Sequence, residues 1–277
     1  MVDKKDPDTY SAIAIIAGQG LLPKLIYDEC MKKGIKVIVI GLEGEFNEQI
    51  FKEIRCTVLK AYNISKIFSH LKINNITKIV IAGRVNRSNI HKLIYDQLGF
   101  KIFTRIIRNG LNDNNIHSII IKFIEENGFQ IISPDKIANT IITPKGNITS
   151  VKIDKDKIID IKKGVKILKK IVVSDIGQGL IIHKGLVIGV EAVEGTNELI
   201  KRCANYLDNI SSGILIKLCK THQDIKLDLP CIGPDTIKNI AKFAYSGIVL
   251  EAQRSIIISN KKSIDLANKN KIFIYGV

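Results

Sequence analysis

Short apolar runs alternate with amphipathic stretches in the first half of the chain, and this alternation restricts the fold more than any other feature. The runs at 12–17 and 78–82 are too short for buried helices, and each is followed by a glycine, so both predict buried strands. A further strand is predicted at 36–40, and helices are predicted at 23–33 and 64–71. Strands alternating with helices indicate an α/β domain with a parallel sheet covered on both faces.

The rest of the chain divides at a polar segment. Helical patterns fill much of 88–127 and a strand is predicted at 129–132, so the first domain is assigned to residues 1–133. Residues 134–150 contain prolines and glycine without a sustained period and are predicted to form a linker. A second domain then covers residues 151–277.

This second domain also mixes both kinds of pattern. A helix is predicted at 154–173, a hairpin follows with strands at 180–182 and 186–190, and a helix begins after Thr196. The remaining elements are a helix at 236–245, a later short helix, and strands at 214–218, 248–250, 255–258 and 272–275.

The formal net charge is +15, from 42 basic and 27 acidic residues, which raises the question of an anionic partner. The charge is spread along a chain rich in Ile, Lys and Asn, a bias that AT-rich codon usage also produces. No basic stripe interleaved with aromatic residues is present, so nucleic-acid binding is not predicted. One group of lysines recurs at helical spacing and predicts a solvated helix face: Lys162, Lys163, Lys166, Lys169 and Lys170.

The five cysteines are odd in number and include no Cys-x-x-Cys pair, which argues against a disulfide framework or a zinc site. Reduced thiols are typical of cytoplasmic proteins. The polar N-terminus does not resemble a signal peptide, and no apolar run approaches the roughly 20 residues that span a bilayer. We therefore expect a soluble cytoplasmic protein that could still touch a membrane surface.

Two candidate binding segments lie in the first domain. Gly18, Gln19 and Gly20 stand between a predicted strand and helix, where glycines let the backbone approach a phosphate. The third glycine of a dinucleotide fingerprint is replaced by Pro23, so the segment could equally be a tight turn. The second segment follows another buried strand and could hold a sugar or phosphate, or form a solvated loop; its residues are Gly83, Asn86 and Arg87.

A third candidate surrounds the predicted hairpin of the second domain. Asp175 and Gln178 precede the hairpin, and Glu191 and Glu194 follow it; carboxylates among small residues can gather a hard cation such as magnesium. The alternative is that these are turn residues, with Thr196 as a helix N-cap. The substrate-binding candidates just after the hairpin are Gly195, Thr196 and Asn197.

Asp228 is the fourth candidate because it lies between apolar neighbours, where a buried carboxylate requires a partner. It could ligate a metal, activate water, or serve as a structural cap. No complete catalytic set of a common kind is present: there is no Gly-x-Ser-x-Gly elbow, paired-histidine zinc motif or Walker loop.

Taken in order, six short segments resemble one family, the cytoplasmic UDP-2,3-diacylglucosamine pyrophosphatases of lipid A biosynthesis. The segments lie at residues 16–23, 82–85, 175–179, 191–196, 227–230 and 244–249. Each is short, but their order and spacing together are specific, and they span nearly the whole chain. Lys226 and Cys231 depart from the pattern, where Arg and Thr are common.

The resemblance implies a Rossmann-like N-terminal domain, a second α/β domain of less common topology, and a homodimer. It implies hydrolysis to UMP and 2,3-diacylglucosamine 1-phosphate, with a divalent cation and with water attacking the phosphorus nearer the sugar. The family depends most on the aspartate that falls on Asp228, and the metal ligands we predict are Asp228, Asp175 and Glu191. Two other classes stay open, an inactive nucleotide-sugar-binding or regulatory protein and a nicotinamide-dependent oxidoreductase.

Overall fold

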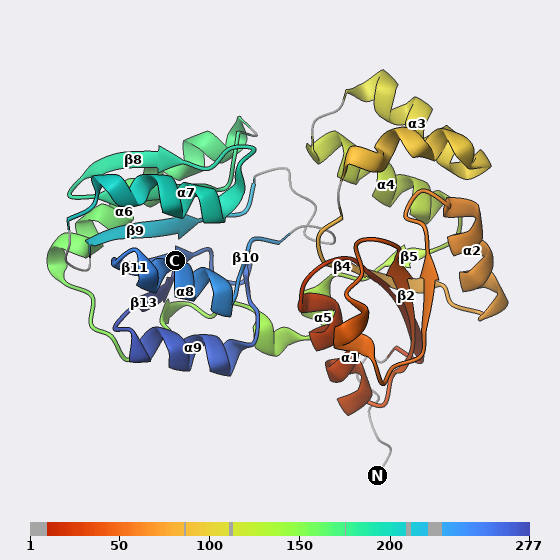
Figure 1. The fold of residues 1–277 in the computed structure, drawn as a ribbon, viewed down its shortest axis with the longest axis horizontal. Coiled ribbons are helices and arrows are strands. Elements are labelled where there is room, and N and C mark those ends of the chain that lie inside the picture. Colours follow the sequence, from red (N-terminus) through yellow and green to blue (C-terminus); the bar gives the residue numbers. More distant parts are fainter. Residues whose placement is uncertain (1–9, 86, 111–112, 175, 209–211, 221–228) are drawn as a thin grey trace, which may run out of the picture. The chain divides into compact units, whose positions relative to one another are not determined.

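The N-terminal unit is built on a parallel sheet whose strands pair in the order β3 (Cys56–Leu59), β2 (Lys36–Leu42), β1 (Ala12–Ala17), β4 (Lys78–Ala82) and β5 (Gln130–Ile131). This computed structural model describes residues 10–85, 87–110, 113–174, 176–208, 212–220 and 229–277, with the backbone alone at 87–89 and 113–115. The described part of the N-terminal unit ends at Asn139, and the second unit begins at Thr140 (Figure 1).

Helices cover both faces of this sheet, as the sequence predicted. They are α1 (Leu22–Lys32), α2 (Ile64–Ile73), α3 (Gln97–Asn109), α4 (Asp113–Glu126) and α5 (Pro134–Ile137), with the 3₁₀ segments η1 (Glu48–Phe51) and η2 (Arg87–Tyr95). Along β1, Ile13 and Ile15 pack with α1, whereas Ala14 and Ile16 pack with α2 to α4. The period of two in a strand therefore distributes one continuous apolar run between two cores.

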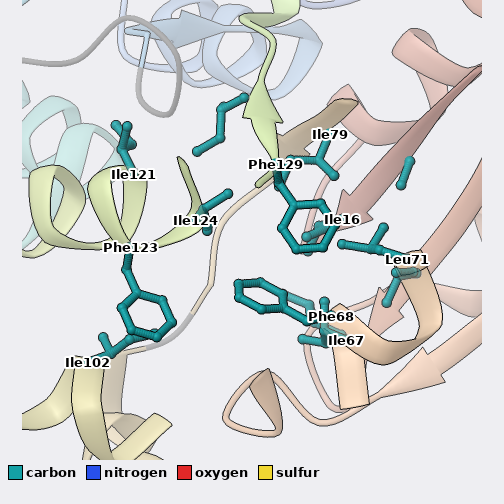
Figure 2. Close-up of a cluster of buried hydrophobic side chains, with 14 of the residues drawn as sticks. Ile16, Ile67, Phe68, Leu71, Ile79, Ile102, Ile121, Phe123, Ile124 and Phe129 are labelled. Atoms are coloured by element: carbon teal, nitrogen blue, oxygen red, sulfur yellow. The ribbon is translucent and has the colours of Figure 1, made fainter. Parts of the chain in front are cut away.

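The core beside α2 to α4 contains the aromatic side chains that Figure 2 shows at close range. The ring centroids of Phe68 and Phe129 are 4.8 Å apart, and those of Phe68 and Phe123 are 6.2 Å apart. Both distances suit favourable aromatic pairs. With no tryptophan in the chain, isoleucine and leucine fill most of the remaining volume.

The second unit carries a mixed sheet in the order β6 (Gly146–Asn147), β13 (Phe273–Gly276), β11 (Tyr245–Leu250), β9 (Ser212–Lys217), β7 (Gly179–His183) and β8 (Leu186–Val190). Strands β9, β11 and β13 are parallel, whereas β6, β7 and β8 run antiparallel to their neighbours. The strands β10 (Cys231–Ile232) and β12 (Ile256–Ile257) form a separate parallel pair. Together the two units confirm the predicted α/β class.

Two helical layers enclose the mixed sheet. Helix α6 (Lys155–Val173) packs on one face with Leu180 and Ile182, while Ile181 faces the other core. That second core contains α7 (Gly195–Cys203), α8 (Pro234–Lys242) and α9 (Asn260–Lys269). The remaining single turns are η3 (Asn139–Ile141) and η4 (Ala204–Tyr206). The lysine face predicted on α6 is exposed, which confirms that prediction.

Some sequence predictions need correction. The helix predicted at 236–245 ends at Lys242, and Tyr245 is the first residue of β11. Strand β3 was missed because its burial is only partial, and β10 because two residues carry no detectable period. Thr196 is not an N-cap, since Glu194 occupies the N-cap position of α7, without a capping side-chain hydrogen bond, and Thr196 lies in the first turn.

Candidate active site

The N-terminal unit brings two predicted segments together at the carboxyl edge of its sheet. Strand β1 pairs with β2 on one side and β4 on the other, which is where the strand order reverses and where open parallel sheets bind ligands. Gly18 N–H donates to the carbonyl of Ala82 at 2.8 Å, and Gln19 N–H donates to the carbonyl of Arg84 at 2.8 Å. The loops that follow β1 and β4 therefore form one small piece of backbone structure.

Glycine is required at this crossing by close approach. A Cβ atom added to Gly18 would lie 2.4 Å from the carbonyl oxygen of Arg84. One added to Gly83 would lie 2.5 Å from the carbonyl oxygen of Gln19, and Gly83 also has a positive φ of 91°. The two glycines thus let the loops touch and leave the end of β1 lined by backbone.

A carboxylate reaches this edge from the loop after β2. Gln19 Nε2 donates a hydrogen bond of 2.6 Å to Glu45 Oε2. Beside this contact lies an open depression of about 580 Å³, lined by Gln19, Gly20, Glu45, Phe46, Asn47, Glu48 and Gln49. Its polar rim and single aromatic ring could contact a nucleoside, and its acidic side chains suit sugar hydroxyls better than phosphate.

The second unit builds its candidate site from charged side chains. Glu191 follows β8 and is 7% exposed, Thr196 lies in the first turn of α7, and Lys217 ends β9 and is 4% exposed. Thr196 Oγ1 donates to Glu191 Oε1 at 2.7 Å, and Lys217 Nζ donates to Thr196 Oγ1 at 2.5 Å. Lys217 Nζ also lies 3.8 Å from Glu191 Oε2.

Two glycines make room for Glu191. A Cβ atom on Gly179 would lie 2.3 Å from Glu191 Oε2, and one on Gly177 would lie 1.8 Å from the Glu191 carbonyl oxygen. Among the described residues, Glu191 Oε2 and Gln178 Oε1 are buried acceptors without a hydrogen-bond partner. Because buried acceptors are nearly always satisfied, each is a place where a ligand, an ion or water could bind.

The neighbouring residues of the 191–197 segment have structural contacts. Arg202 Nη2 donates to Glu194 Oε1 at 2.9 Å and to the carbonyl oxygen of Val190 at 2.7 Å. Hydrogen bonds from the backbone of Glu194 itself, and then from Arg202, hold the pKa of the Glu194 carboxyl below its usual value. Asn197 Oδ1 accepts a hydrogen bond of 3.1 Å from Asn239, so its side chain is tied to α8. This loop is held in place by its own polar contacts.

The segment after β9 is fixed by Glu251. Glu251 Oε2 accepts a hydrogen bond from Cys219 N–H at 2.8 Å, and Oε1 lies 3.2 Å from Arg254 Nη1. Its own backbone N–H donates to the carbonyl oxygen of Lys217 at 3.2 Å. The carboxyl ends of β9 and β11 are therefore joined through this one carboxylate.

The structure describes only some of the predicted site residues. Gly18, Gln19 and Gly83 lie together in the first unit, and Glu191 and Thr196 lie together in the second. Gly20 lines the depression, whereas Gly195, with a φ of 78°, opens α7. Asn86, Asp175 and Asp228 lie outside the described residues, and the Arg87 side chain does too.

Sequence reasoning missed Lys217, Glu45 and Glu251. Lys217 carried a detectable signal, because it follows three apolar residues and precedes Leu218 in a strand that reads as buried. A lysine that is buried in such a run requires a partner of opposite charge or a hydrogen-bond acceptor. Glu45 and Glu251 lie in loops, where nothing in the sequence separates them from solvated carboxylates.

Next to the position of Asp228, the described chain is well anchored. Leu229 is buried, and the carbonyl oxygen of Pro230 accepts a hydrogen bond of 2.8 Å from Ile256 N–H. Strand β10 then begins at Cys231 and pairs with β12. The segment that follows Asp228 thus belongs to the folded second unit.

Family comparisons now add to this geometry. Residues 12–141 match the model of the LpxI N-terminal domain, and residues 144–275 match that of the LpxI C-terminal domain. The chain belongs to the LpxI family. A relative named UDP-2,3-diacylglucosamine pyrophosphatase LpxI, from Caulobacter vibrioides (strain ATCC 19089 / CIP 103742 / CB 15), is 29% identical over 96% of this chain and 97% of its own length.

A solved structure shows a weaker likeness. The Bordetella bronchiseptica enzyme WbmG in complex with NAD and UDP is 12% identical, with a TM-score of 0.29, over 44% of this chain and 36% of that chain. A score this low supports no statement about the ligands of an LpxI family member. The resemblance predicted from the six segments is confirmed by the two family matches alone.

At the polar edge of the second unit, which consists of Glu191, Thr196 and Lys217, a divalent cation would meet one carboxylate. Within the described ranges, no three His, Cys, Asp or Glu side chains gather closely enough to hold a metal ion. Glu191 Oε2 nevertheless offers a buried oxygen without a hydrogen-bond partner, and carboxylate oxygens are the ligands that Mg²⁺ prefers. Lys217 lies 3.8 Å from the same oxygen, so a cation bound there would share the carboxylate with an ammonium group.

Proposed function

We propose that this protein hydrolyses the pyrophosphate of UDP-2,3-diacylglucosamine to UMP and 2,3-diacylglucosamine 1-phosphate in lipid A biosynthesis. The observation that carries the proposal is the match of both LpxI domains, which together reach from residue 12 to residue 275. The Caulobacter relative named for this activity aligns over nearly its full length. These findings therefore support the function of a phosphoanhydride hydrolase best.

The two candidate regions suit different parts of such a substrate. A pyrophosphate concentrates negative charge, which increases on the leaving phosphate as the bond breaks, and positioned donors or cations offset it. In the N-terminal unit, backbone at the Gly18–Gly83 crossing allows close approach, and the depression beside Gln19 and Glu45 can take sugar hydroxyls. In the second unit, the buried ammonium of Lys217 lies 3.8 Å from Glu191 Oε2, so its positive charge is shared with that carboxylate.

We further propose that the reaction requires Mg²⁺ or another divalent cation, held by Asp228, Asp175 and Glu191. The buried Oε2 of Glu191 supports this assignment, because it accepts no hydrogen bond from the described residues and its ion pair with Lys217 is as long as 3.8 Å. When bound, the cation would neutralise charge on the pyrophosphate oxygens. We assign to Asp228 the positioning or deprotonation of the attacking water, because the resemblance implies that the family depends most on this aspartate and a carboxylate can perform either step.

Product analysis tests the reaction directly. We expect the purified full-length protein to convert UDP-2,3-diacylglucosamine to UMP and the sugar 1-phosphate, as read by ³¹P NMR and mass spectrometry. In water enriched in ¹⁸O, the label should enter 2,3-diacylglucosamine 1-phosphate, since attack is expected at the phosphorus nearer the sugar. Excess EDTA should stop turnover, and added Mg²⁺ should restore it.

Each part of the proposal can fail separately. Substrate that is bound but not cleaved would favour the inactive nucleotide-sugar-binding alternative. Label recovered in UMP would contradict the site of attack, and full turnover in excess EDTA would contradict the need for a metal. Stabilisation by NAD or NADP, measured as a rise in Tm, would favour the oxidoreductase alternative.

We also propose that the protein works in the cytoplasm as a homodimer, with weak contact to the inner membrane. No described helix is long and apolar enough to cross a bilayer, so any contact would be peripheral. The exposed face of α6 supports such contact, because basic clusters attract anionic lipid. Its exposed members are Ile159, Lys162, Lys163, Lys166, Lys169, Lys170 and Val173.

A vesicle experiment tests this surface. Replacing Lys162, Lys166 and Lys169 with glutamine should reduce sedimentation with vesicles that contain anionic phospholipid. Binding of the wild type to these vesicles should weaken as the Debye length falls from about 10 Å at 0.1 M salt to about 3 Å at 1 M. Glutamine at Lys261, Lys262 and Lys269 on α9 is the control of equal charge change. Equal loss in both variants would mean that net charge alone acts, and light scattering would report the dimer.

A further inference from the structure

Helix α3 of the N-terminal unit has a wider apolar face than the fold buries. Ile102 and Ile106 are buried in the core beside α2 to α4. Phe100 and Ile107 are 52% and 55% exposed, and the partly buried Phe103 lies between them in the sequence. Spacings of three and four residues place these last three side chains in one row along the helix, called here the α3 stripe. Apolar side chains that are exposed in a row are typical of an interaction surface.

The start of α3 is firmly held, so a loose helix does not account for the exposure of the stripe. The buried carboxylate of Asp96 accepts hydrogen bonds from Gly99 N–H at 2.8 Å and from Ser65 N–H at 3.1 Å. It thereby joins the first turns of α3 and α2. A Cβ atom added to Gly99 would lie 2.6 Å from the carbonyl oxygen of Leu93, so α3 also packs closely against η2. The α3 stripe is therefore presented by a fixed helix.

Basic side chains accompany the α3 stripe, and no acidic residue occurs in this helix. Arg105 Nη1 lies 2.6 Å from Glu126 Oε2, so its charge is shared with α4. Lys101 and Arg108 are exposed, and each directly follows one end of the stripe, which places both cations on the same flank. An apolar row with cations beside it is typical of helices that lie in the interface of an anionic bilayer.

The charge of α3 also decides between possible partners. A second copy that packed its own stripe here by two-fold symmetry would bring cations toward cations, and like charges at close range are unfavourable. An anionic phospholipid surface instead offers phosphate groups to Lys101 and Arg108 and hydrocarbon to the stripe. Tyr95, which precedes α3 and is 77% exposed, adds an amphipathic ring of the kind that gathers at membrane interfaces.

We infer that the α3 stripe inserts into the headgroup region of an anionic phospholipid bilayer, with Lys101 and Arg108 at the lipid phosphates. The inference rests on the proposed function, in which the substrate carries two acyl chains and the protein contacts the inner membrane. It goes beyond the electrostatic contact proposed for α6, because it requires apolar side chains to enter the bilayer. Insertion can be measured without substrate.

The chain contains no tryptophan, so one substitution provides a fluorescent reporter. We expect the emission of Phe100→Trp to shift to the blue with vesicles that contain phosphatidylglycerol, and to be quenched by brominated acyl chains. Ile73→Trp is the control, because Ile73 ends α2 in the same unit and is 79% exposed. Its emission should not change. Equal shifts in the two variants, or no shift in Phe100→Trp, would overturn the inference.

Emission in buffer alone tests the other occupants of the stripe. Phe100→Trp should emit like a solvated indole before vesicles are added. Emission that is already blue would show that another part of the chain covers the stripe, or a second copy where dilution reverses the shift. Either result would overturn the inference.

A pair of double variants measures the contribution of the stripe to affinity. Replacing Phe100 and Ile107 with serine should weaken vesicle binding about tenfold or more, because two large apolar side chains no longer leave water. Replacing Met31 and Ile73 with serine is the control, since both are exposed in the same unit, and it should leave binding unchanged. Equal affinities of the two double variants would contradict insertion through α3.

The inference and the proposals on which it rests fail in different ways. Vesicle binding that depends on the α6 lysines, without an emission shift in Phe100→Trp, would leave the electrostatic contact standing and overturn the insertion. Absence of hydrolysis by the wild type would refute the proposed function, whereas the emission of Phe100→Trp would still decide whether α3 enters the bilayer.

Discussion

At the edge after β1 and β4, the N-terminal unit brings backbone against backbone, whereas the polar edge of the second unit brings charged side chains together. The first arrangement depends on Gly18 and Gly83, whose missing Cβ atoms allow the contact. The second depends on Glu191, Thr196 and Lys217, whose charges and hydroxyl are paired in a buried place. Substitutions that add volume should therefore damage the first edge, and substitutions that change charge should damage the second.

The largest expected effect is a loss of charge in the second unit. We expect Asp228→Asn to fold normally and to lose about 10²–10⁴-fold in kcat, because the amide keeps the shape but not the acid–base function. The control is Asp235→Asn, since the side chain of Asp235 is 89% exposed and pairs with the exposed Lys238. Near-normal turnover by Asp228→Asn, or its failure to fold by Tm, would contradict the catalytic assignment.

Added volume in the first unit should have the next largest effect. Gly83→Ala must place a Cβ atom 2.5 Å from the carbonyl oxygen of Gln19 at a φ of 91°. An unfavourable backbone conformation alone costs about 1–3 kcal/mol. We expect Gly83→Ala to lower the free energy of unfolding by more than that and to raise KM. Gly128→Ala is the control, because its φ is 87° and no atom lies within 4 Å of the added Cβ.

Urea unfolding of these two glycine variants measures the difference. If Gly83→Ala and Gly128→Ala lower the free energy of unfolding equally, the close approach of the two loops does not require glycine at position 83. If only Gly83→Ala also raises KM, the crossing takes part in substrate binding.

Loss of the Glu45 charge in the N-terminal unit should affect stability and activity less. Glu45→Gln replaces the acceptor of the 2.6 Å hydrogen bond from Gln19, at a place that is partly open to solvent. We expect a stability change below about 0.5 kcal/mol, and a change in kcat/KM of about twofold. A tenfold loss of kcat/KM with unchanged Tm would instead assign Glu45 to substrate binding and weaken the contrast between the edges.

The smallest effect concerns pH. Hydrogen bonds lower the pKa of Glu194 in the folded protein, so this carboxylate contributes stability above its unfolded value of 4.5, and loses it as pH falls through the folded pKa. Arg202→Met removes one of these contacts. The Tm gap between wild type and variant should be small at pH 7 and should narrow below pH 4.5. A gap that stays the same from pH 7 to below pH 4.5 would show that Arg202 acts without the charge of Glu194.

Much of the local structure could be predicted from the sequence. Apolar runs such as 12–17 are too short for helices, and the helices between them carry one apolar face, so element type followed from periodicity. Pro23 and Gly34 marked the ends of α1 for steric reasons. The predicted domain limits of 133 and 151 remain a prediction beside the observed division at Asn139 and Thr140.

Pairing across the chain was decided only by the tertiary structure. The order β3-β2-β1-β4-β5 places Gly83 beside Gly18, although 64 residues separate them, and no local pattern encodes that choice. Lys217 donates a hydrogen bond to Thr196, which lies 21 positions earlier in the sequence. A sequence shows that a buried charge needs a partner, because desolvation is costly anywhere, but the partner is fixed by which strand ends meet.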